Sequence, residues 1–247
     1  MRMNHPDGKR LLATVRDGDY AHAGEEEAIH LLWERLPKIP HQSCLDAGCG
    51  RGGTAAFVQS HGWPTVTGID IDAESIAEAS ARHPGIPFHA FDIAQAGVRF
   101  PETFDIIYAF NAFYAFPDQS TALQSLAEAA RPQAELCLFD YVNRGGFFDD
   151  PFARFPESVL WQPINLDVFP AQLEASGWKM TGRLLLHDAY RRWYENLCGR
   201  FTARRETLRA EFSADLVEYA IGYYRAMLTA IENGALGGAI VFAERVA

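Results

Sequence analysis

An acidic residue stands immediately before a glycine-rich turn, in the segment LDAGCGRGG at residues 45–53. Glycines let a backbone turn sharply and approach a ligand closely, because no Cβ atom stands in the way. The next apolar stretch, residues 65–69, ends in Asp70, where a carboxylate can accept hydrogen bonds from both hydroxyls of a ribose. Together, the turn and Asp70 predict a binding site for a nucleotide-like cofactor.

The acid before the turn, Asp46, distinguishes two classes of cofactor. Gly48, Gly50 and Gly53 also satisfy the G-x-G-x-x-G spacing of dinucleotide-binding proteins. The Asp46 carboxylate would lie close to a dinucleotide pyrophosphate, and two negative groups in a dry crevice repel each other strongly. S-adenosylmethionine has no phosphate and carries a sulfonium and an ammonium, so acidic groups beside it are favourable. Asp46 therefore favours S-adenosylmethionine, and an NAD-dependent oxidoreductase is the weaker alternative.

The chain resembles the class I S-adenosylmethionine-dependent methyltransferases of the small-molecule type. Their first motif has the form acid-x-Gly-x-Gly-x-Gly, which Asp46, Gly48, Gly50 and Gly52 match, and further matches follow in order over roughly residues 20–145. The resemblance implies methyl transfer from S-adenosylmethionine to a small organic acceptor, apolar or aromatic, with S-adenosylhomocysteine as the product. A non-catalytic protein that binds S-adenosylmethionine is the alternative.

The resemblance also implies which residues hold the cofactor. Asp92, in the expected strand at residues 88–93, would contact the adenine amino group, and Phe110 and Asn111 would flank the methionine portion. The implied cofactor site comprises Tyr20, Gly24, Asp46, Ala47, Gly48, Gly50, Gly52, Asp70, Ile71, Asp92, Ile93, Phe110 and Asn111.

Methyl transfer requires the nucleophile, the methyl carbon and the sulfur in line, and it needs a base only when the acceptor must lose a proton. Tyr20 and Gly24 match the Tyr-x-x-x-Gly start of the subgroup that contains phosphoethanolamine and sterol C-methyltransferases, whose tyrosine closes over cofactor and acceptor. The phosphoethanolamine enzymes follow their fourth strand with Asp-x-x-x-His, whereas residues 111–115 read NAFYA and lack the histidine. The candidate catalytic residues are Tyr20, His22, Tyr114 and His187; packing is the alternative for Tyr20, and a structural role is the alternative for His187.

The elements that position these residues alternate between short apolar runs and amphipathic segments, a pattern typical of βαβ units. We therefore expect an α/β fold, a Rossmann-like, doubly wound sheet of seven mostly parallel strands, in which the last strand is antiparallel as the resemblance implies. Ligands of such sheets bind beyond the carboxyl ends of the strands. Besides the strands at 45–47, 65–69 and 88–93, we expect strands at 104–111, 134–142, 181–186 and 239–246 and helices at 25–36, 119–130 and 170–176.

We expect a single methyltransferase domain over residues 1–247, with a helical insertion before the last strand. Apolar residues recur there at helical spacing, which predicts either a lid over the acceptor pocket or a dimer interface. These residues are Tyr190, Trp193, Tyr194, Leu197, Phe201, Leu208, Phe212, Leu216, Tyr219, Tyr223 and Met227. The expected parts are a helical cap (1–40), a cofactor-binding core (41–142), a substrate loop with the sixth strand (143–187), the lid (188–234) and the last strand (235–247).

Net charge, apolar runs and cysteine spacing limit the kinds of ligand and partner that the chain is expected to bind. A net charge of −10 disfavours a nucleic-acid substrate, and no apolar run is long enough for a membrane span, so a cytoplasmic protein with a small-molecule acceptor is expected. The four cysteines have no zinc-ligand spacing, so no metal is expected. An arginine-rich stretch between residues 183 and 209 is interpreted as a solvated helix face or, alternatively, as an anion-attracting rim.

Overall fold

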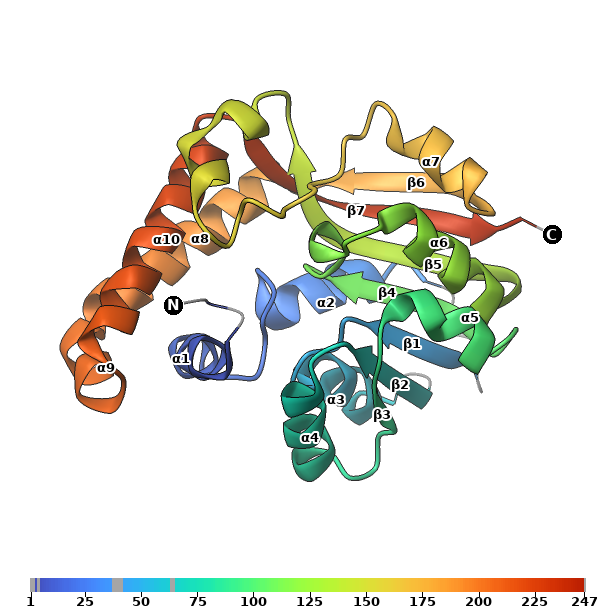
Figure 1. Ribbon diagram of the computed structural model, residues 1–247, viewed down its shortest axis with the longest axis horizontal. Coiled ribbons are helices and arrows are strands. Elements are labelled where there is room, and N and C mark those ends of the chain that lie inside the picture. The colour runs from blue at the N-terminus through green and yellow to red at the C-terminus, as the bar shows by residue number, and fades with distance from the viewer. Residues whose placement is uncertain (1–2, 4, 37–41, 63–64, 247) are drawn as a thin grey trace.

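Seven strands form one sheet (Figure 1): β1 (Ser43–Ala47), β2 (Thr65–Asp70), β3 (Phe88–Ala90), β4 (Phe104–Phe110), β5 (Ala130–Asn143), β6 (Trp178–Leu185) and β7 (Leu236–Arg245). This computed structural model describes residues 3, 5–36, 42–62 and 65–246. The strand order is β3, β2, β1, β4, β5, β7, β6, and β7 runs antiparallel to both of its neighbours while the other pairs are parallel. The predicted seven-stranded fold is therefore confirmed.

Helices cover both faces of this sheet, because alternate side chains of each strand point to opposite sides. One face packs against α2 (Glu25–Trp33), α3 (Gly53–Ser60), α8 (His187–Ala203) and α10 (Ala214–Glu232), and α1 (Pro6–Arg16) packs against α8 and α10. The other face packs against α5 (Ala96–Arg99), α6 (Gln119–Ala129) and α7 (Phe169–Ala175). The chain winds outward from β1 in both directions, so the carboxyl ends of β1 and β4 flank the point where a ligand is expected.

The structure departs from the predicted elements in the N-terminal segment and at β3. The sequence analysis expected a helical cap over residues 1–40 but placed a helix only at 25–36; α1 forms before it, with Pro6 in its first turn and with Leu11, Leu12 and Val15 buried. β3 is shorter than expected, because the Asp92 side chain accepts a hydrogen bond from the Ala94 amide and starts a short 3-10 helix. The expected boundary between residues 40 and 41 lies outside the described residues.

The insertion between β6 and β7 consists of α8, α9 (Arg205–Glu211) and α10. Nearly all side chains of its predicted apolar stripe are buried within this one chain, and only Phe212 and Tyr219 are half-buried. The stripe is therefore covered by the chain's own core, which does not favour its use as a dimer interface. The role of α8 to α10 as a lid stays a prediction.

Two adjacent glycines of β7 permit close packing on both faces of the sheet. A Cβ atom at Gly238 would lie 2.0 Å from the ring of Tyr190, and one at Gly237 would lie 2.3 Å from the Nδ1 atom of His187. Because neighbouring strand residues point to opposite faces, Tyr190 and His187 contact opposite sides of β7.

Replacing Gly238 with alanine is expected to lower the free energy of unfolding by about 1–3 kcal/mol, because the buried Tyr190 ring must move. A matched control is Gly182→Ala in β6, where a Cβ would meet no atom within 4 Å. Urea unfolding measures the free energy of unfolding of both variants. An equal loss in the two would show that displacement of the Tyr190 ring does not cause the destabilisation.

Candidate functional site

The glycine turn joins β1 to α3 with three residues in the left-handed region of backbone space. Gly48, Gly50 and Gly52 have φ angles of 82°, 52° and 80°. A Cβ at Gly48 would lie 2.5 Å from the Cβ of Ala112, so a larger residue there would push the turn away from the loop after β4. No atom lies within 4 Å of a Cβ built on Gly50, which leaves open space above the middle of the turn.

Asp46 lies at the end of β1, directly beneath this turn, with 2% of its surface exposed. Burial, together with the negative charge of Asp70, raises the pKa of Asp46 to about 8. The Tyr108 hydroxyl on β4 lies close enough to the Asp46 side chain to lower this pKa in part, but the Asp46 Oδ2 atom and that hydroxyl make no hydrogen bond of normal geometry among the described residues. A buried carboxylate with an unfilled acceptor atom fits a cationic ligand and disfavours an anionic one.

Asp70 and Asp92 follow the ends of β2 and β3 as predicted. One carboxylate oxygen of Asp70 accepts from the Gly50 amide at 2.8 Å, and the other accepts from the Asp72 amide at 2.9 Å. Asp70 therefore ties the glycine turn to the start of α4 (Ala73–Arg82). Ile71 is 69% exposed at this edge, whereas Ile93 is buried below Asp92.

A small cavity of about 60 Å³ lies over the turn. Asp46, Gly48 and Gly50 line it from the sheet side, together with Phe110 at the end of β4. Tyr20 and His22, from the segment before α2, also line it, as do three residues of α1: Lys9, Leu12 and Ala13. The structure thus brings two of the four candidate catalytic residues to the predicted cofactor site.

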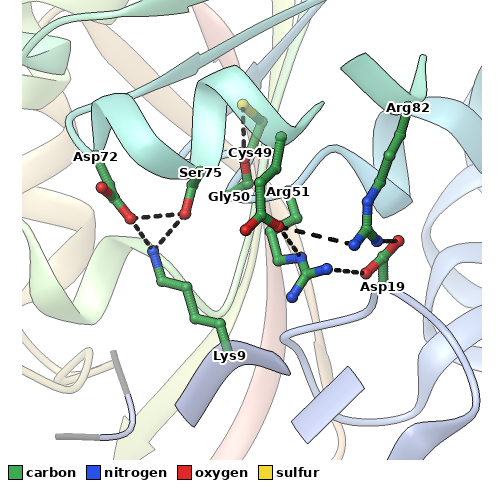
Figure 2. A network of polar contacts seen from close by, with 9 residues as sticks. Lys9, Asp19, Cys49, Gly50, Arg51, Asp72, Ser75 and Arg82 are labelled. Carbon is green, nitrogen blue, oxygen red and sulfur yellow. Dashed lines mark hydrogen bonds and ion pairs between the residues drawn. The ribbon is translucent and has the colours of Figure 1, made fainter. Parts of the chain in front are cut away.

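The first of two polar clusters fastens α1 over the cavity (Figure 2). The Lys9 Nζ atom donates to the Asp72 carboxylate at 2.5 Å and to the Ser75 hydroxyl at 2.7 Å. Lys9 belongs to α1, whereas Asp72 caps α4 and Ser75 lies in its first turn. Lys9 therefore links the N-terminal helix to the same edge that carries Asp70.

The second cluster centres on Arg51, in the glycine turn itself. Its guanidinium pairs with Asp19 at 3.2 Å and with Glu78 at 3.1 Å, and Arg82 also pairs with Asp19 (Figure 2). Asp19 precedes Tyr20, so the pairs hold the segment that carries Tyr20 against α3 and α4.

His22 is buried and has partners for both ring nitrogens. Nδ1 lies 3.0 Å from the Ala23 carbonyl oxygen, and Nε2 lies 3.1 Å from the Thr54 hydroxyl. Burial lowers the pKa of His22 to about 3, so the ring is neutral and weakly basic. The His22 ring centre lies 4.7 Å from that of Phe110, which places it as a wall of the cavity.

Tyr20 lies beside His22, with their ring centres 5.6 Å apart. Its hydroxyl donates to a Glu26 carboxylate oxygen at 3.2 Å. Burial and the Glu26 charge raise the pKa of Tyr20, so its hydroxyl is suited to donate a hydrogen bond rather than to act as a base.

Asn111 connects three parts of the chain at the end of β4. Its side-chain oxygen accepts from the Ala23 amide at 3.0 Å, and its Nδ2 donates to the Tyr190 hydroxyl of α8 at 2.9 Å. Its φ of 46° turns the backbone away from the strand. The neighbouring Gly24 has no room for a side chain, because the Trp193 ring would lie 2.7 Å from its Cβ.

The other two candidates lie away from the cavity over the turn. Tyr114 packs against Tyr141 and Trp161, with ring centres 4.9 and 4.1 Å away. His187 lines a separate hollow on the far side of β7. The structure thus separates Tyr114 and His187 from Tyr20 and His22.

The sequence analysis missed the contribution of α1 and of Arg51 to the site. Pro6 at a helix start, followed by Leu11, Leu12 and Val15 at helical spacing, is the signal that would have predicted α1. Within the described part of the chain, no three His, Cys, Asp or Glu residues are grouped so as to hold a metal ion. No helix in that part is long and apolar enough to cross a membrane.

The sequence is similar to those of known methyltransferases. Residues 20–196 match a family model described as a methyltransferase domain. A methyltransferase named GfsG from Streptomyces halstedii is 30% identical over 168 residues, which cover 64% of this chain and 59% of that protein. The 27-O-demethylrifamycin SV methyltransferase of Amycolatopsis mediterranei is 25% identical over 233 residues, covering 89% of this chain and 85% of that protein.

A solved structure has a closely similar fold. Phosphoethanolamine N-methyltransferase 2 of Haemonchus contortus, in complex with phosphomonomethylethanolamine and S-adenosylhomocysteine, superposes with a TM-score of 0.90 at 17% identity. The match covers all of this chain and 59% of that chain. The chain therefore spans about three fifths of the length of this protein and of the Streptomyces methyltransferase.

Proposed function

Since this chain belongs to the methyltransferase domain family, we propose that it transfers a methyl group from S-adenosylmethionine to a small organic acceptor. The observation that carries the proposal is Asp46, buried beneath the glycine turn with one carboxylate oxygen unpartnered. S-adenosylmethionine supplies a sulfonium-bound methyl group and an ammonium, and a nearby carboxylate stabilises positive charge. The Haemonchus enzyme named above was solved with S-adenosylhomocysteine bound, which supports the same cofactor class.

The chain's own residues supply the contacts that such a cofactor needs. The Asp70 carboxylate keeps its bond to the Gly50 amide and accepts the ribose hydroxyls on its remaining lone pairs, and Asp92 faces the adenine amino group. The exposed Ile71 side chain offers apolar surface to the adenine ring. The remaining cofactor contacts proposed are Tyr20, Gly24, Ala47, Gly48, Gly50, Gly52, Ile93, Phe110 and Asn111.

An acceptor with apolar or aromatic surface is supported by the rings beyond Asn111. Tyr141 packs against Tyr114, Trp161 and Tyr190, with ring centres 4.9, 4.6 and 5.6 Å away. These rings connect to the cofactor site through the hydrogen bond between Asn111 and Tyr190. The Amycolatopsis relative is named for an organic acceptor, 27-O-demethylrifamycin SV, which is consistent with small-molecule methylation.

Catalysis then rests mainly on positioning. The bound cofactor would supply the methyl group: the acceptor's lone pair would bond to the methyl carbon as the bond from carbon to sulfur breaks, and a proton lost by the acceptor would pass to solvent. His22 is too weak a base to take an acceptor proton efficiently, and His187 lies elsewhere. We therefore assign His22 to shaping the cavity and Tyr20 to covering the methyl group, where its hydroxyl turns from Glu26 to donate a hydrogen bond near the reacting atoms.

Replacing Tyr20 with phenylalanine is expected to leave cofactor affinity within about twofold and to lower turnover roughly tenfold, the effect of one lost hydrogen bond. The reason is that the ring keeps its packing on His22 while the hydroxyl is lost. Steady-state rates with labelled S-adenosylmethionine measure the effect. Unaltered rates would assign Tyr20 a packing role alone.

The proposed activity is tested by incubating the protein with radiolabelled S-adenosylmethionine and a panel of phenols, alcohols and amines. Label transfer to one class identifies the acceptor chemistry. Isothermal titration with S-adenosylhomocysteine and NADH separates the alternatives: binding of the former without any turnover indicates a non-catalytic protein, and binding of NADH instead indicates an oxidoreductase.

A further inference from the structure

A second hollow of about 330 Å³ opens at the carboxyl end of β5 and β6. It shares no lining residue with the cavity over the glycine turn. The side chains of His187 and Arg144 lie against Gly237, on the face of β7 opposite Tyr190 and the aromatic rings. This basic hollow is defined by Asn143, Arg144, Asn165, Asp167, Arg183 and His187.

The hollow contains two guanidinium groups without partners. Among the arginines that the structure describes, the side chains of Arg144, Arg154 and Arg183 alone make neither an ion pair nor a hydrogen bond. Two of these three line the same hollow, whereas the arginines of α8 and α9 pair with nearby carboxylates. Unpaired guanidiniums that converge on a concavity are typical of carboxylate or phosphate recognition.

The two asparagines add further donors. The Asn143 side-chain oxygen accepts from the amides of Gly145 and Phe147, at 2.9 and 3.3 Å. The Asn165 side-chain oxygen accepts from the Asp167 amide at 3.1 Å. With both carboxamide oxygens occupied by backbone, the NH₂ group of each side chain is left to donate.

The side chain of His187 is sensitive to the positive charge in this hollow. Its Nδ1 atom is buried without a hydrogen-bond partner among the described residues. Burial and the positive charge of Arg144 lower its pKa. His187 is also the first residue of the 17-residue helix α8, whose N-terminal end favours negative charge.

We propose that the basic hollow binds a small organic oxyanion, a carboxylate or a phosphate ester, between Arg144 and Arg183. The half-exposed Leu185 side chain lines the same hollow and offers apolar surface to the body of the ligand. Asp167 repels a second negative group, so a single oxyanion head fits best. The site lies apart from the cofactor cavity and does not depend on the proposed methyl transfer.

The test is an NMR titration of the whole protein with labelled histidine rings, in which the His187 signal is assigned with His187→Gln. Sodium phosphate, sodium butyrate and sodium chloride are added separately at constant ionic strength. We expect a saturable shift of the His187 signal and a rise in its pKa with phosphate or butyrate, because a bound anion neutralises Arg144. Tighter phosphate binding points to a phosphate ester, and tighter butyrate binding points to a carboxylate.

Arg144→Gln and Arg183→Gln are each expected to weaken anion binding about tenfold, the effect of one lost charge-assisted contact. The matched control is Arg191→Gln on α8, whose guanidinium pairs with Glu195 at 3.0 Å outside the hollow, and it is expected to leave binding unchanged. A shift that chloride reproduces, or that survives in the Arg144→Gln, Arg183→Gln double variant, overturns the proposal. Since no step measures methyl transfer, failure here is distinguishable from failure of the proposed function.

Discussion

Replacement of Asp70 with alanine is expected to weaken S-adenosylmethionine binding by roughly 1–3 kcal/mol, the scale of losing hydrogen bonds to a charged group. The carboxylate is expected to accept both ribose hydroxyls, and it also holds the Gly50 amide at 2.8 Å. Loss of Asp70 therefore removes ligand contacts and loosens the turn. Isothermal titration calorimetry with S-adenosylhomocysteine measures the change in affinity.

The matched control is Glu74→Ala, an exposed acid four residues along the chain in α4. It removes the same charge from the same edge, so it separates a general electrostatic effect from the specific contact. Unchanged affinity in Asp70→Ala, or equal loss in both variants, would contradict the ribose assignment.

The protonation state of Asp46 is expected to control cofactor affinity between pH 6 and 8. In the free protein its pKa is about 8, so at pH 6 the carboxyl is mostly neutral and must lose a proton before it can stabilise the cationic cofactor. Affinity should therefore rise with pH, by up to about tenfold per pH unit, and level off above pH 8. Calorimetry in two buffers of different ionisation enthalpy would detect the proton released.

Asp46→Asn is the decisive comparison, because the α-amino group of S-adenosylmethionine titrates in a similar range. The asparagine variant is expected to bind more weakly at pH 8, by about 1.5–3 kcal/mol, and to lose the rise in affinity between pH 6 and 8. The effect of pH on the stability of the cofactor-free protein is opposite to its effect on cofactor affinity. A raised pKa in the folded state means that the free energy of unfolding of the cofactor-free protein falls as pH rises from about 4 to 8. An identical pH profile in Asp46→Asn would exclude the role assigned to Asp46.

The glycine turn and the acids at the strand ends could be predicted from the sequence because they are local features. The turn needs glycines at positive φ, and Asp46, Asp70 and Asp92 follow directly from strand ends that the apolar runs reveal. Continuous apolar runs also predicted strands in the regions of β5 and β7, because strands that are buried on both faces of a sheet are apolar throughout.

The surroundings of the candidate catalytic residues were less predictable, because they depend on contacts between residues far apart in the chain. Nothing local to Asn111 indicates that its side chain joins Ala23 to Tyr190, and nothing local to His187 indicates that it faces away from the cavity. α1 was missed because its buried face is short, and its fastening by Lys9 depends on Asp72, which is 63 residues away. Long-range pairs of this kind leave no periodic signal.

The way α1 is fastened has a consequence for turnover. A space of about 60 Å³ holds only a water molecule or two, whereas pockets for cofactor-sized ligands measure several hundred Å³. Lys9 and Arg51 both line this space, so weakening their ion pairs is expected to help the donor enter and the spent product leave. Because added salt weakens such pairs, exchange of the nucleoside is expected to become faster as the ionic strength rises.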